Sequence, residues 1–539
     1  MAHIQLIGVA SKADTQGRVV NFPYAYPIII RELKKTSHSF SHVDTHLDHV
    51  TTPDLIEQIA KMEAKIYGIS AWTHNYALVK KITQIIRAHH PDSWIIVGGI
   101  LSGNDDVVIN HTCADIVSTG AEGEYILPEI LDCLDNDISK LRLVKGITFK
   151  DKITGDIIKT PRRPVMTKEI FQSTERPVYE YFAKPIQELV DRQNSRSDIP
   201  VAAFPLLIAR GCPFPCTFCG HTYGRLMLRK NWELWFNEVE YLVNSFGITG
   251  FFGLDNNMFL NEKDVDDYCE VYAARKASFT AIVSMRTTFG HKAMFEKLYN
   301  HGIRVVLFGY ETGSDKMLAN MKKLVKMEKV REVVKSCMDA GVFTHGNFIF
   351  GTIGENPDTI KETRDFMLLL EKWKLEQIKD FPERKNTSGY VWSILIPSPT
   401  SELYAVARKA GLIKDEEEYL LTLSDEKYQE NVKGRNFGIR LNEGAGDVNM
   451  SEFTSHAALT YYVRYSFNLV KAKANLLPGA KFNVALFSEL SWTAFKSITA
   501  YAATLLKDAL SRKKGFFYDP KLAEGCAPAS NHEIDLAIK

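Results

Sequence analysis

The segment "RGCPFPCTFCG", residues 210–220, places three cysteines within eleven residues. The whole chain of 539 residues has only eight cysteines, so the segment concentrates thiols at one place, as Cys212, Cys216 and Cys219. Pro213 and Pro215 remove backbone donors and prevent a regular helix there. The segment is therefore expected to form a loop that directs three thiolates toward one inorganic centre.

The bulk composition is that of a soluble globular protein with several domains. Hydrophobic residues make up 45% of the chain and charged residues 24%, and the net charge is +1. This balance offers no overall attraction to nucleic acid or to an anionic membrane. The N-terminus lacks the pattern of a signal peptide, and no stretch approaches the roughly 18 to 20 apolar residues of a transmembrane segment. The chain is expected to be cytoplasmic, without a nucleic acid partner.

Clustered cysteines in the cytoplasm more often bind metal or do redox chemistry than form disulfides. Structural zinc takes four ligands, and no second C-x2-C pair follows, although His221 would supply a fourth ligand. A [4Fe–4S] cluster held by three thiolates leaves one iron open for another ligand. An open iron indicates chemistry at the cluster, whereas the zinc alternative indicates a structural role.

The C-x3-C-x2-C spacing resembles the hallmark of the radical S-adenosylmethionine (radical SAM) superfamily, which follows the first barrel strand. An apolar strand candidate at 202–209 runs into the loop, and Phe218 matches the aromatic that the family places near the adenine. The resemblance implies a [4Fe–4S] cluster whose open iron is chelated by S-adenosylmethionine. One electron from the cluster would then cleave this cofactor to methionine and a 5′-deoxyadenosyl radical.

Downstream of the cysteines, short β-rich runs alternate with helical patterns. With the strand candidate before the loop they make six strands, the other five lying at 247–255, 279–287, 302–311, 346–354 and 389–398. Such alternation predicts βα units in a parallel sheet with ligands at the carboxyl ends of the strands. Six units fit the partial (β/α)6 barrel of the radical SAM superfamily, over residues 201–404.

Polar residues and glycines follow these strands in order. Each alone has an ordinary role in a turn, cap or surface ion pair, but their succession behind the three-cysteine loop favours a shared site. The resemblance implies an acidic contact to the cofactor amino group, an arginine on its carboxylate, a glutamate on the ribose or aminocarboxylate, and a glycine-rich segment near the adenine. The residues at these positions are Asp255, Arg286, Glu311, Gly351, Gly354 and Glu355.

The N-terminal region, residues 1–139, has its own alternation of strands and helices. Buried strands are expected within 3–11, 40–47, 66–72, 93–100 and 114–124. This pattern predicts a doubly wound, Rossmann-like sheet with its ligand at the strand ends. The region resembles the cobalamin-binding domain of one radical SAM class, including its "GG" and "GEGE" signatures, here "GG" and "GAEGE". The resemblance implies cobalamin contacts at Gly98, Gly99, Gly120, Glu122 and Gly123.

One motif departs from that resemblance. Cobalamin domains that replace the lower axial base use D-x-H-x-x-G, whereas the nearest string here, "DTHLDH" at 44–49, follows the second strand and lacks the glycine. His46 is therefore expected to be a loop or packing residue, and a bound cobalt would have no histidine beneath it. Loss of cobalamin from this domain, or its replacement by another ligand, stays open.

Two further regions complete the organisation. Residues 140–200 are expected to form a connector with a β-hairpin around Thr154 and Gly155. Residues 405–539 are expected to form a mainly helical C-terminal domain, because their apolar residues recur at helical spacing. Some of its aromatics would alternatively line a substrate cavity: Tyr461, Tyr462, Trp492 or Tyr501.

Together these features predict an α/β, cobalamin-dependent radical SAM methyltransferase that acts on an unactivated carbon. By the resemblance, the adenosyl radical removes a substrate hydrogen and methylcobalamin supplies the methyl group. The expected partners are a small-molecule or peptide substrate and an electron donor such as flavodoxin or ferredoxin. A cobalamin-dependent cyclase, oxidoreductase or rearrangement enzyme remains an alternative, as does a non-catalytic cobalamin or Fe–S sensor.

Overall fold

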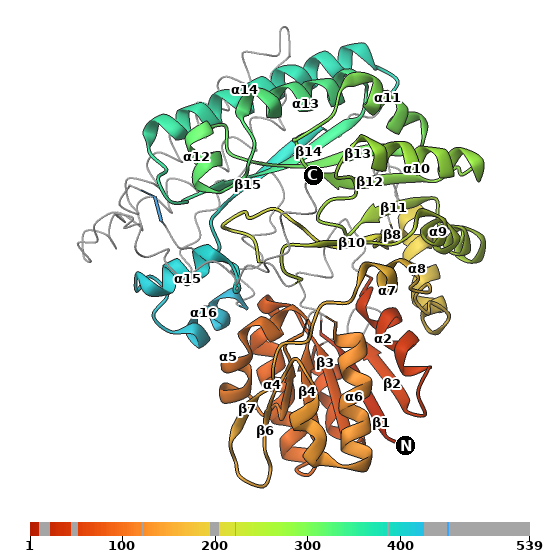
Figure 1. Ribbon diagram of the computed structural model, residues 1–539, viewed down its shortest axis with the longest axis vertical. Helices are drawn as coiled ribbons and strands as arrows, with labels where there is room; N and C mark the ends of the chain where they lie inside the picture. Colours follow the sequence, from red (N-terminus) through yellow and green to blue (C-terminus); the bar gives the residue numbers. More distant parts are fainter. Residues whose placement is uncertain are drawn as a thin grey trace. The chain divides into compact units, whose positions relative to one another are not determined.

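The computed structural model in Figure 1 describes residues 1–9, 22–44, 52–120, 122–194, 204–220, 223–384, 388–424 and 450–451. The chain divides into two compact units. Unit 1 comprises Met1–Gly211, His221–Phe252 and Asp415–Gln429. The described residues of unit 2 lie within Cys212–Gly220, Gly253–Lys414 and 450–451.

Unit 1 is built on a seven-stranded sheet. Its strands are β1 (His3–Gly8), β2 (Ser39–Asp44), β3 (Ile66–Ser70), β4 (Trp94–Gly98), β5 (Ile116–Ser118), β6 (Ile147–Lys150) and β7 (Ile157–Lys159). The order is β2-β1-β3-β4-β5-β6-β7, and the pairs among β1 to β5 are parallel. The order 2-1-3-4-5 is a doubly wound arrangement that places ligands at the carboxyl ends of its strands. The expected Rossmann-like fold is confirmed.

Helices cover both faces of this sheet. They are α2 (Ala25–Leu33), α3 (Thr52–Lys61), α4 (Tyr76–His89), α5 (Asp105–His111) and α6 (Gly123–Asn136). Helix α2 contacts α6 and α3 contacts α4, and Figure 1 shows α2 and α6 on one side with α4 and α5 on the other. Helix α4 buries Val79, Ile82 and Ile86, whose spacing places them on one helix face. Continuous burial along β1, β3 and β4 follows from this double cover.

The expected hairpin forms, and it belongs to the sheet. Strands β6 and β7 pair antiparallel, and β6 also pairs antiparallel with β5. Ile147 and Phe149 are buried, so the hairpin extends the core beyond residue 140. The rest of the connector contributes η3 (Ile138–Leu143), α7 (Lys168–Gln172), η4 (Glu180–Phe182) and α8 (Ala183–Asn194) to unit 1.

Unit 1 also includes the chain just before and just after the cysteine loop. The single strand expected over 202–209 is wrong in detail, because it is split into β8 (Phe204–Leu206) and β9 (Ala209–Gly211). Strand β9 turns away to pair antiparallel with β10 (Met227–Arg229), which α9 (Trp232–Phe246) follows. Helix α16 (Glu416–Leu423), expected in the C-terminal domain, instead groups with unit 1, where it contacts α4 and α5.

The second sheet has six strands in the order β15-β14-β13-β12-β11-β8. They include β11 (Gly250–Gly253), β12 (Thr280–Met285), β13 (Ile303–Glu311), β14 (Phe343–Phe350) and β15 (Gly389–Ile394). Strands β12 to β15 pair in parallel, and each of the six corresponds to one expected strand. The expected partial (β/α)6 arrangement is confirmed.

Helices follow β11 to β15, one after each strand except β13, which two helices follow. They are α10 (Glu262–Ala274), α11 (Lys292–Asn300), α12 (Asp315–Asn320), α13 (Met327–Asp339), α14 (Pro357–Asp380) and α15 (Glu402–Lys409). Figure 1 shows α11, α13 and α14 along one side of the sheet. Helix α14 begins where Asn356 accepts hydrogen bonds from the backbone of residues 358 and 359, with Pro357 at its first position.

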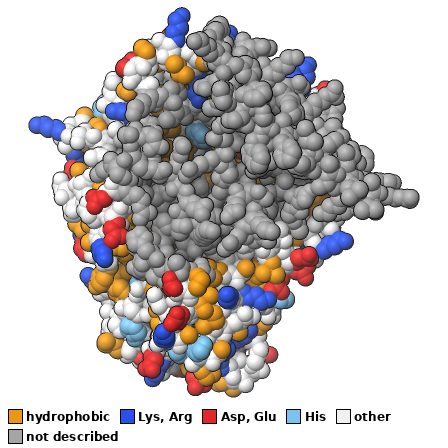
Figure 2. Space-filling view, turned by 180° about the vertical axis from the view of Figure 1, so that it is seen from behind, with side chains coloured by type: hydrophobic (Ala, Val, Ile, Leu, Met, Phe, Trp, Pro, Cys, Tyr) orange, Lys and Arg blue, Asp and Glu red, His pale blue; other side chains and the backbone are white. Residues whose placement is uncertain are grey.

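Several sequence expectations lie outside the described residues. They concern His46, His221 and the C-terminal aromatics Tyr461, Tyr462, Trp492 and Tyr501. Among the helices that the structure describes, none has the length and apolar character needed to cross a bilayer. On the face seen in Figure 2, basic and acidic side chains are interspersed over the described surface.

Candidate active site

The three-cysteine segment in unit 2 forms the expected loop. Residues 212–220 contain neither helix nor strand. The backbone N–H of Thr217 donates to the Met321 carbonyl at 3.1 Å, and the Thr217 carbonyl accepts from the N–H of Leu403 at 3.0 Å. Backbone bonds to two separate elements therefore fix the middle of a loop that has no regular structure of its own.

Polar side chains approach two of the thiols. Asn257 Nδ2 lies 3.3 Å from Cys212 Sγ, and Arg286 Nη1 lies 3.5 Å from Cys216 Sγ. Burial raises the pKa of Cys212 and raises the pKa of Cys219 to about 11. Burial therefore favours the protonated form of Cys212 and Cys219, and a metal centre that binds these two side chains must displace their protons.

The thiol set fits an iron–sulfur cluster. Within the described residues, no group of three or more His, Cys, Asp or Glu side chains has the geometry of one bound metal ion. A [4Fe–4S] cluster takes each thiolate on a different iron, so its ligands stand further apart than those of a mononuclear site. Three thiols on one loop, with donors facing two of them, fit such a cluster.

Arg286 joins the cysteine loop to the end of β12. Its guanidinium carbon lies 3.7 Å from the centre of the Phe214 ring, and its Nη2 donates to the Lys323 carbonyl. The residue is 7% exposed, yet its Nε has no partner in the described part of the chain. A buried guanidinium with one unused donor fits an anionic ligand group such as a carboxylate.

Glu311 has an unusual backbone at the end of β13. Its φ is +59°, a left-handed value that costs a non-glycine residue about 1 to 3 kcal/mol. The register between β13 and β14 shifts between Gly309 and Glu311, which marks a bulge. The bulge directs Glu311 toward Lys323, whose Nζ lies 2.5 Å from Glu311 Oε1, both side chains being buried. A strained residue in a buried ion pair at a strand end indicates a functional position.

Lys323 and Asn257 were not foreseen from the sequence. Lys323 lies between Lys322 and Leu324, which have φ values of +52° and +55°. Its Nζ also lies 5.9 Å from the centre of the Phe218 ring, at the third cysteine. The surrounding string "MKKLVK" is typical of a solvated charged turn, and only the contacts distinguish Lys323, which is 6% exposed.

The other predicted cofactor residues of unit 2 also follow strands of the sheet. Glu355 Oε2 accepts the backbone N–H of Gly351 at 2.8 Å, which closes the turn after β14. Gly354 has a φ of +82°, and a Cβ there would lie 2.3 Å from Asn320 Nδ2. Asp255, 4% exposed, follows β11. These residues lie at the expected strand ends, and their contacts with a cofactor stay predictions.

The carboxyl edge of the sheet in unit 1 holds the predicted glycines. A Cβ on Gly99, where φ is +83°, would lie 2.6 Å from the Ala71 carbonyl oxygen. A Cβ on Gly98 would lie 3.9 Å from Ser118 Cβ, and one on Gly123 would lie 3.9 Å from Ser118 Oγ. Ser118 Oγ is buried without a partner in the described chain. This edge therefore offers bare backbone and a spare hydrogen-bonding group, which suits a bulky polar ligand.

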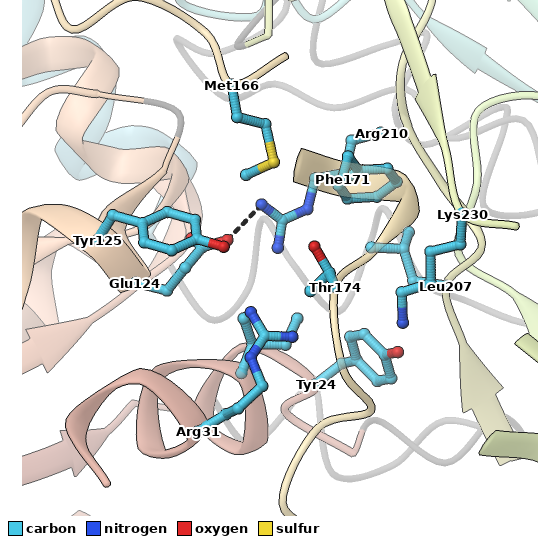
Figure 3. Close-up of a pocket in the computed structure, with 11 residues that line it drawn as sticks. Tyr24, Arg31, Glu124, Tyr125, Met166, Phe171, Thr174, Leu207, Arg210 and Lys230 are labelled. Carbon is cyan, nitrogen blue, oxygen red and sulfur yellow. Dashed lines mark hydrogen bonds and ion pairs between the residues drawn. The ribbon is translucent and has the colours of Figure 1, made fainter. Parts of the chain in front are cut away.

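The two glutamates of "GAEGE", Glu122 and Glu124, accept hydrogen bonds from other residues of unit 1. Glu122 Oε1 accepts the backbone N–H of Met166 at 2.5 Å, and burial raises the pKa of its carboxyl. Glu124 Oε1 accepts from Arg210 Nη1 at 2.5 Å, and both side chains are buried. Figure 3 shows this pair at a small pocket into which Arg31 also points. A Cβ on Gly120 would lie 2.3 Å from Ile126 Cδ1, so Gly120 has no open space beside it.

Comparison with known proteins identifies one matching family and several relatives. Residues 206–367 match the radical SAM superfamily. A protein of Pyrococcus horikoshii named an uncharacterized methyltransferase is 23% identical over 347 residues, 64% of this chain and 72% of its own. The anaerobic magnesium-protoporphyrin IX monomethyl ester cyclase of Cereibacter sphaeroides is 23% identical over 411 residues. That match covers 72% of this chain and 60% of the cyclase.

Solved structures extend the likeness to both units. The cobalamin-dependent S-adenosylmethionine radical enzyme OxsB, with aqua-cobalamin and S-adenosylmethionine bound, superimposes with a TM-score of 0.66. The superposition covers 95% of this chain and 74% of OxsB at 16% identity, so it concerns the fold. This chain therefore carries a radical SAM domain and shares its overall fold with a cobalamin-dependent radical SAM enzyme.

Proposed function

We propose that this protein is a cobalamin-dependent radical SAM enzyme that methylates an unactivated carbon. The observation that carries the proposal is the buried constellation around the cysteine loop, where Arg286 reaches Cys216 and the strained Glu311 pairs with Lys323. A non-catalytic sensor has no need of such a site. The methyltransferase name of the Pyrococcus relative supports methyl transfer.

In this proposal, the side chains around the cysteine loop bind the cluster and S-adenosylmethionine. Cys212, Cys216 and Cys219 hold a [4Fe–4S] cluster, which together with S-adenosylmethionine supplies a carbon radical when both are bound. Arg286 binds the carboxylate of S-adenosylmethionine through its spare Nε, while Phe214 stacks on the guanidinium and limits its movement. Glu311 accepts from the ribose hydroxyl or the amino group, and Lys323 positions Glu311.

Unit 1 receives cobalamin at the carboxyl edge of its sheet. Gly98 and Gly123 allow close approach of the ligand to the backbone, Gly99 lets the chain after β4 pass close to Ala71, and Ser118 offers a hydrogen bond. When bound, the corrinoid supplies the methyl group. Glu122 and Glu124 hold the start of α6 in place through Met166 and Arg210.

Cleavage of S-adenosylmethionine tests the enzymatic part of the proposal. The full chain is reconstituted anaerobically with iron and sulfide, reduced with dithionite, and assayed for 5′-deoxyadenosine and methionine. Cys216→Ala is expected to abolish both the cluster absorbance and the cleavage. Cys269→Ala, which alters a buried thiol on α10, is the matched control and should retain both. Cleavage that survives in Cys216→Ala would contradict the assignment.

A cyclase that uses the same cofactors without methyl transfer is the second candidate, because the Cereibacter relative is a cyclase. The two differ in the fate of the methyl group. With ¹³C-methyl-labelled S-adenosylmethionine and a small-molecule extract, a methyltransferase places the label in a new product. A cyclase consumes S-adenosylmethionine and alters a substrate without labelling it.

A further inference from the structure

Two asparagines in unit 1 occupy helix N-caps without capping them. Asn75 precedes α4 and Asn104 precedes α5, and neither side chain accepts a hydrogen bond from the first turn of its helix. Asparagine is among the most favoured N-cap residues because its side chain normally satisfies one of those N–H groups. Both side chains therefore lack the hydrogen bond that an N-cap asparagine usually accepts from a backbone N–H of the first turn.

The two side chains are also buried. Asn75 is 2% exposed and Asn104 is 6% exposed. Asn75 Nδ2, Asn75 Oδ1 and Asn104 Oδ1 have no hydrogen-bond partner among the described residues. An unpaired amide inside a protein lowers the stability of the ligand-free fold, since folding removes its bonds to water without replacing them. Such groups occur where a ligand supplies the missing partner.

Both asparagines lie at the ligand edge of the sheet. Asn75 ends η1 (Thr73–Asn75), which follows β3, and Asn104 ends η2 (Ile100–Asn104), which follows β4. The two short helices contact each other, and the N–H of Leu101 in η2 donates to the Ala71 carbonyl at 3.1 Å. Ala71 is also the residue that a Cβ on Gly99 would strike. The two short helices that end in these asparagines therefore lie beside the backbone at the end of β4.

Ser118 adds a third group of the same kind at the end of β5. It is 8% exposed, its Oγ has no partner in the described chain, and it lies beside Gly98 and Gly123. The ends of three neighbouring strands therefore each carry a buried, uncharged hydrogen-bonding group without a partner. Uncharged groups of this kind suit a ligand with a neutral polar periphery better than a phosphate or a carboxylate.

We propose that Asn75 and Asn104, with Ser118, form the hydrogen-bonding wall of the unit 1 site and bind the carboxamide groups at the edge of a corrin ring. A corrin ring carries acetamide and propionamide side chains, and each amide both donates and accepts, as asparagine does. The inference rests on the proposed binding of cobalamin. To the proposed function it adds the residues that recognise a corrinoid, which they do through the carboxamide groups around its ring.

The test separates ligand binding from structural stability. Asn75→Leu and Asn104→Leu replace each amide with an apolar group of similar size in the full chain. Thr83→Val is the matched control, because Thr83 is fully buried and its Oγ1 donates to the Lys80 carbonyl at 2.9 Å. The measurements are the unfolding temperature without ligand and the Kd for hydroxocobalamin, obtained by equilibrium dialysis with cobalt counting.

We expect the asparagine variants to unfold without ligand at the wild-type temperature or above it, and to bind hydroxocobalamin about tenfold more weakly. Thr83→Val should unfold at a lower temperature and bind normally. Cobinamide, which lacks the nucleotide but keeps the ring carboxamides, should lose affinity by the same factor. Where leucine does not fold, Asn75→Ala and Asn104→Ala remove the same groups without added branching.

Variants that lose stability without ligand and bind hydroxocobalamin as tightly as wild type would overturn the inference. An unchanged affinity for cobinamide would also overturn it, since the asparagines would then contact the nucleotide. Failure of the wild-type chain to bind any corrinoid would contradict the proposed function itself, and this inference with it. The wild-type control therefore distinguishes the two failures.

Discussion

The cysteine loop of unit 2 and the ligand edge of unit 1 differ in how their polar groups are satisfied. Around the cysteines, charged side chains already have partners: Arg286 stacks on the Phe214 ring and Lys323 pairs with Glu311. At the edge of unit 1, Asn75, Asn104 and Ser118 are neutral and unpartnered within the described chain. The first arrangement is preorganised for an ionic cofactor, whereas the second keeps its hydrogen-bonding capacity for a neutral, amide-rich one.

Breaking the ion pair between Glu311 and Lys323 should have the largest effect on stability. Glu311→Gln leaves the ammonium group of Lys323 buried without its carboxylate, so we expect it to lower the free energy of unfolding by about 3 to 5 kcal/mol. It should also weaken binding of S-adenosylmethionine. Denaturant unfolding and equilibrium binding of the cofactor measure the two effects.

The double variant Glu311→Gln with Lys323→Met separates the effect on stability from the effect on binding of S-adenosylmethionine. Replacing the lysine removes the unpaired charge, so stability should largely return while cofactor binding stays weak. Binding that recovers together with stability would show that Glu311 acts only through the fold.

A methyl group added at Gly99, at the ligand edge of unit 1, should have the next largest effect on stability. Gly99 has φ +83° and ψ −167°, a conformation essentially restricted to glycine, and a Cβ would lie 2.6 Å from the Ala71 carbonyl oxygen. Gly99→Ala is expected to cost about 2 to 3 kcal/mol of stability and to weaken corrinoid binding. Gly155→Ala is the control, because Gly155 has φ +79° but nothing within 4 Å, and about 1 kcal/mol is expected there. Equal losses in the two variants would show that the contact at Gly99 is unimportant.

The smallest expected effect concerns the attachment of α16 to unit 1. Glu417 Oε1 accepts from Tyr76 at 2.9 Å and from Lys80 at 2.5 Å. Partial burial acts to raise the pKa of the Glu417 carboxyl, but these hydrogen bonds outweigh it and the net pKa is lowered. The carboxylate therefore stabilises the fold fully above the ordinary glutamate pKa of about 4.3, and this stabilisation is lost as the pH falls through the lowered value.

Glu417→Gln should accordingly lower stability by about 1 kcal/mol at pH 7, and the difference from wild type should shrink in acid. Thermal unfolding at several pH values measures this, with Glu418→Gln on the exposed face of the same helix as control. A difference that grows as the pH falls would contradict the role of the Glu417 carboxylate.

The fold was largely predictable because both sheets are built from repeated alternation of a strand and a helix. Runs of apolar residues between helical patterns identified the strands of both sheets, and three cysteines around two prolines identified the loop. The split between β8 and β9 was missed, because "AAFPLLIA" is continuously apolar and does not reveal where the chain turns to pair with β10.

The site was only partly predictable. Arg286 and Glu311 could be placed because they end strands, but Lys323 and Asn257 contribute through tertiary contacts that leave no pattern in the sequence. Nothing in the sequence distinguishes Asn75 and Asn104, and only the absence of capping bonds in the structure sets them apart. Glu122 fitted a cofactor signature, yet its carboxylate bonds to the backbone of Met166.

The central claim is that one chain holds both an iron–sulfur cluster and a corrinoid. The most direct measurement is anaerobic reconstitution with iron, sulfide and hydroxocobalamin, followed by gel filtration and quantification of iron and cobalt per chain. We expect about four irons, as a [4Fe–4S] cluster requires, and about one cobalt for a single corrinoid site. Iron without cobalt would contradict the assignment of unit 1 and remove cobalamin from the proposed function, and a chain that retains neither metal would contradict the account as a whole.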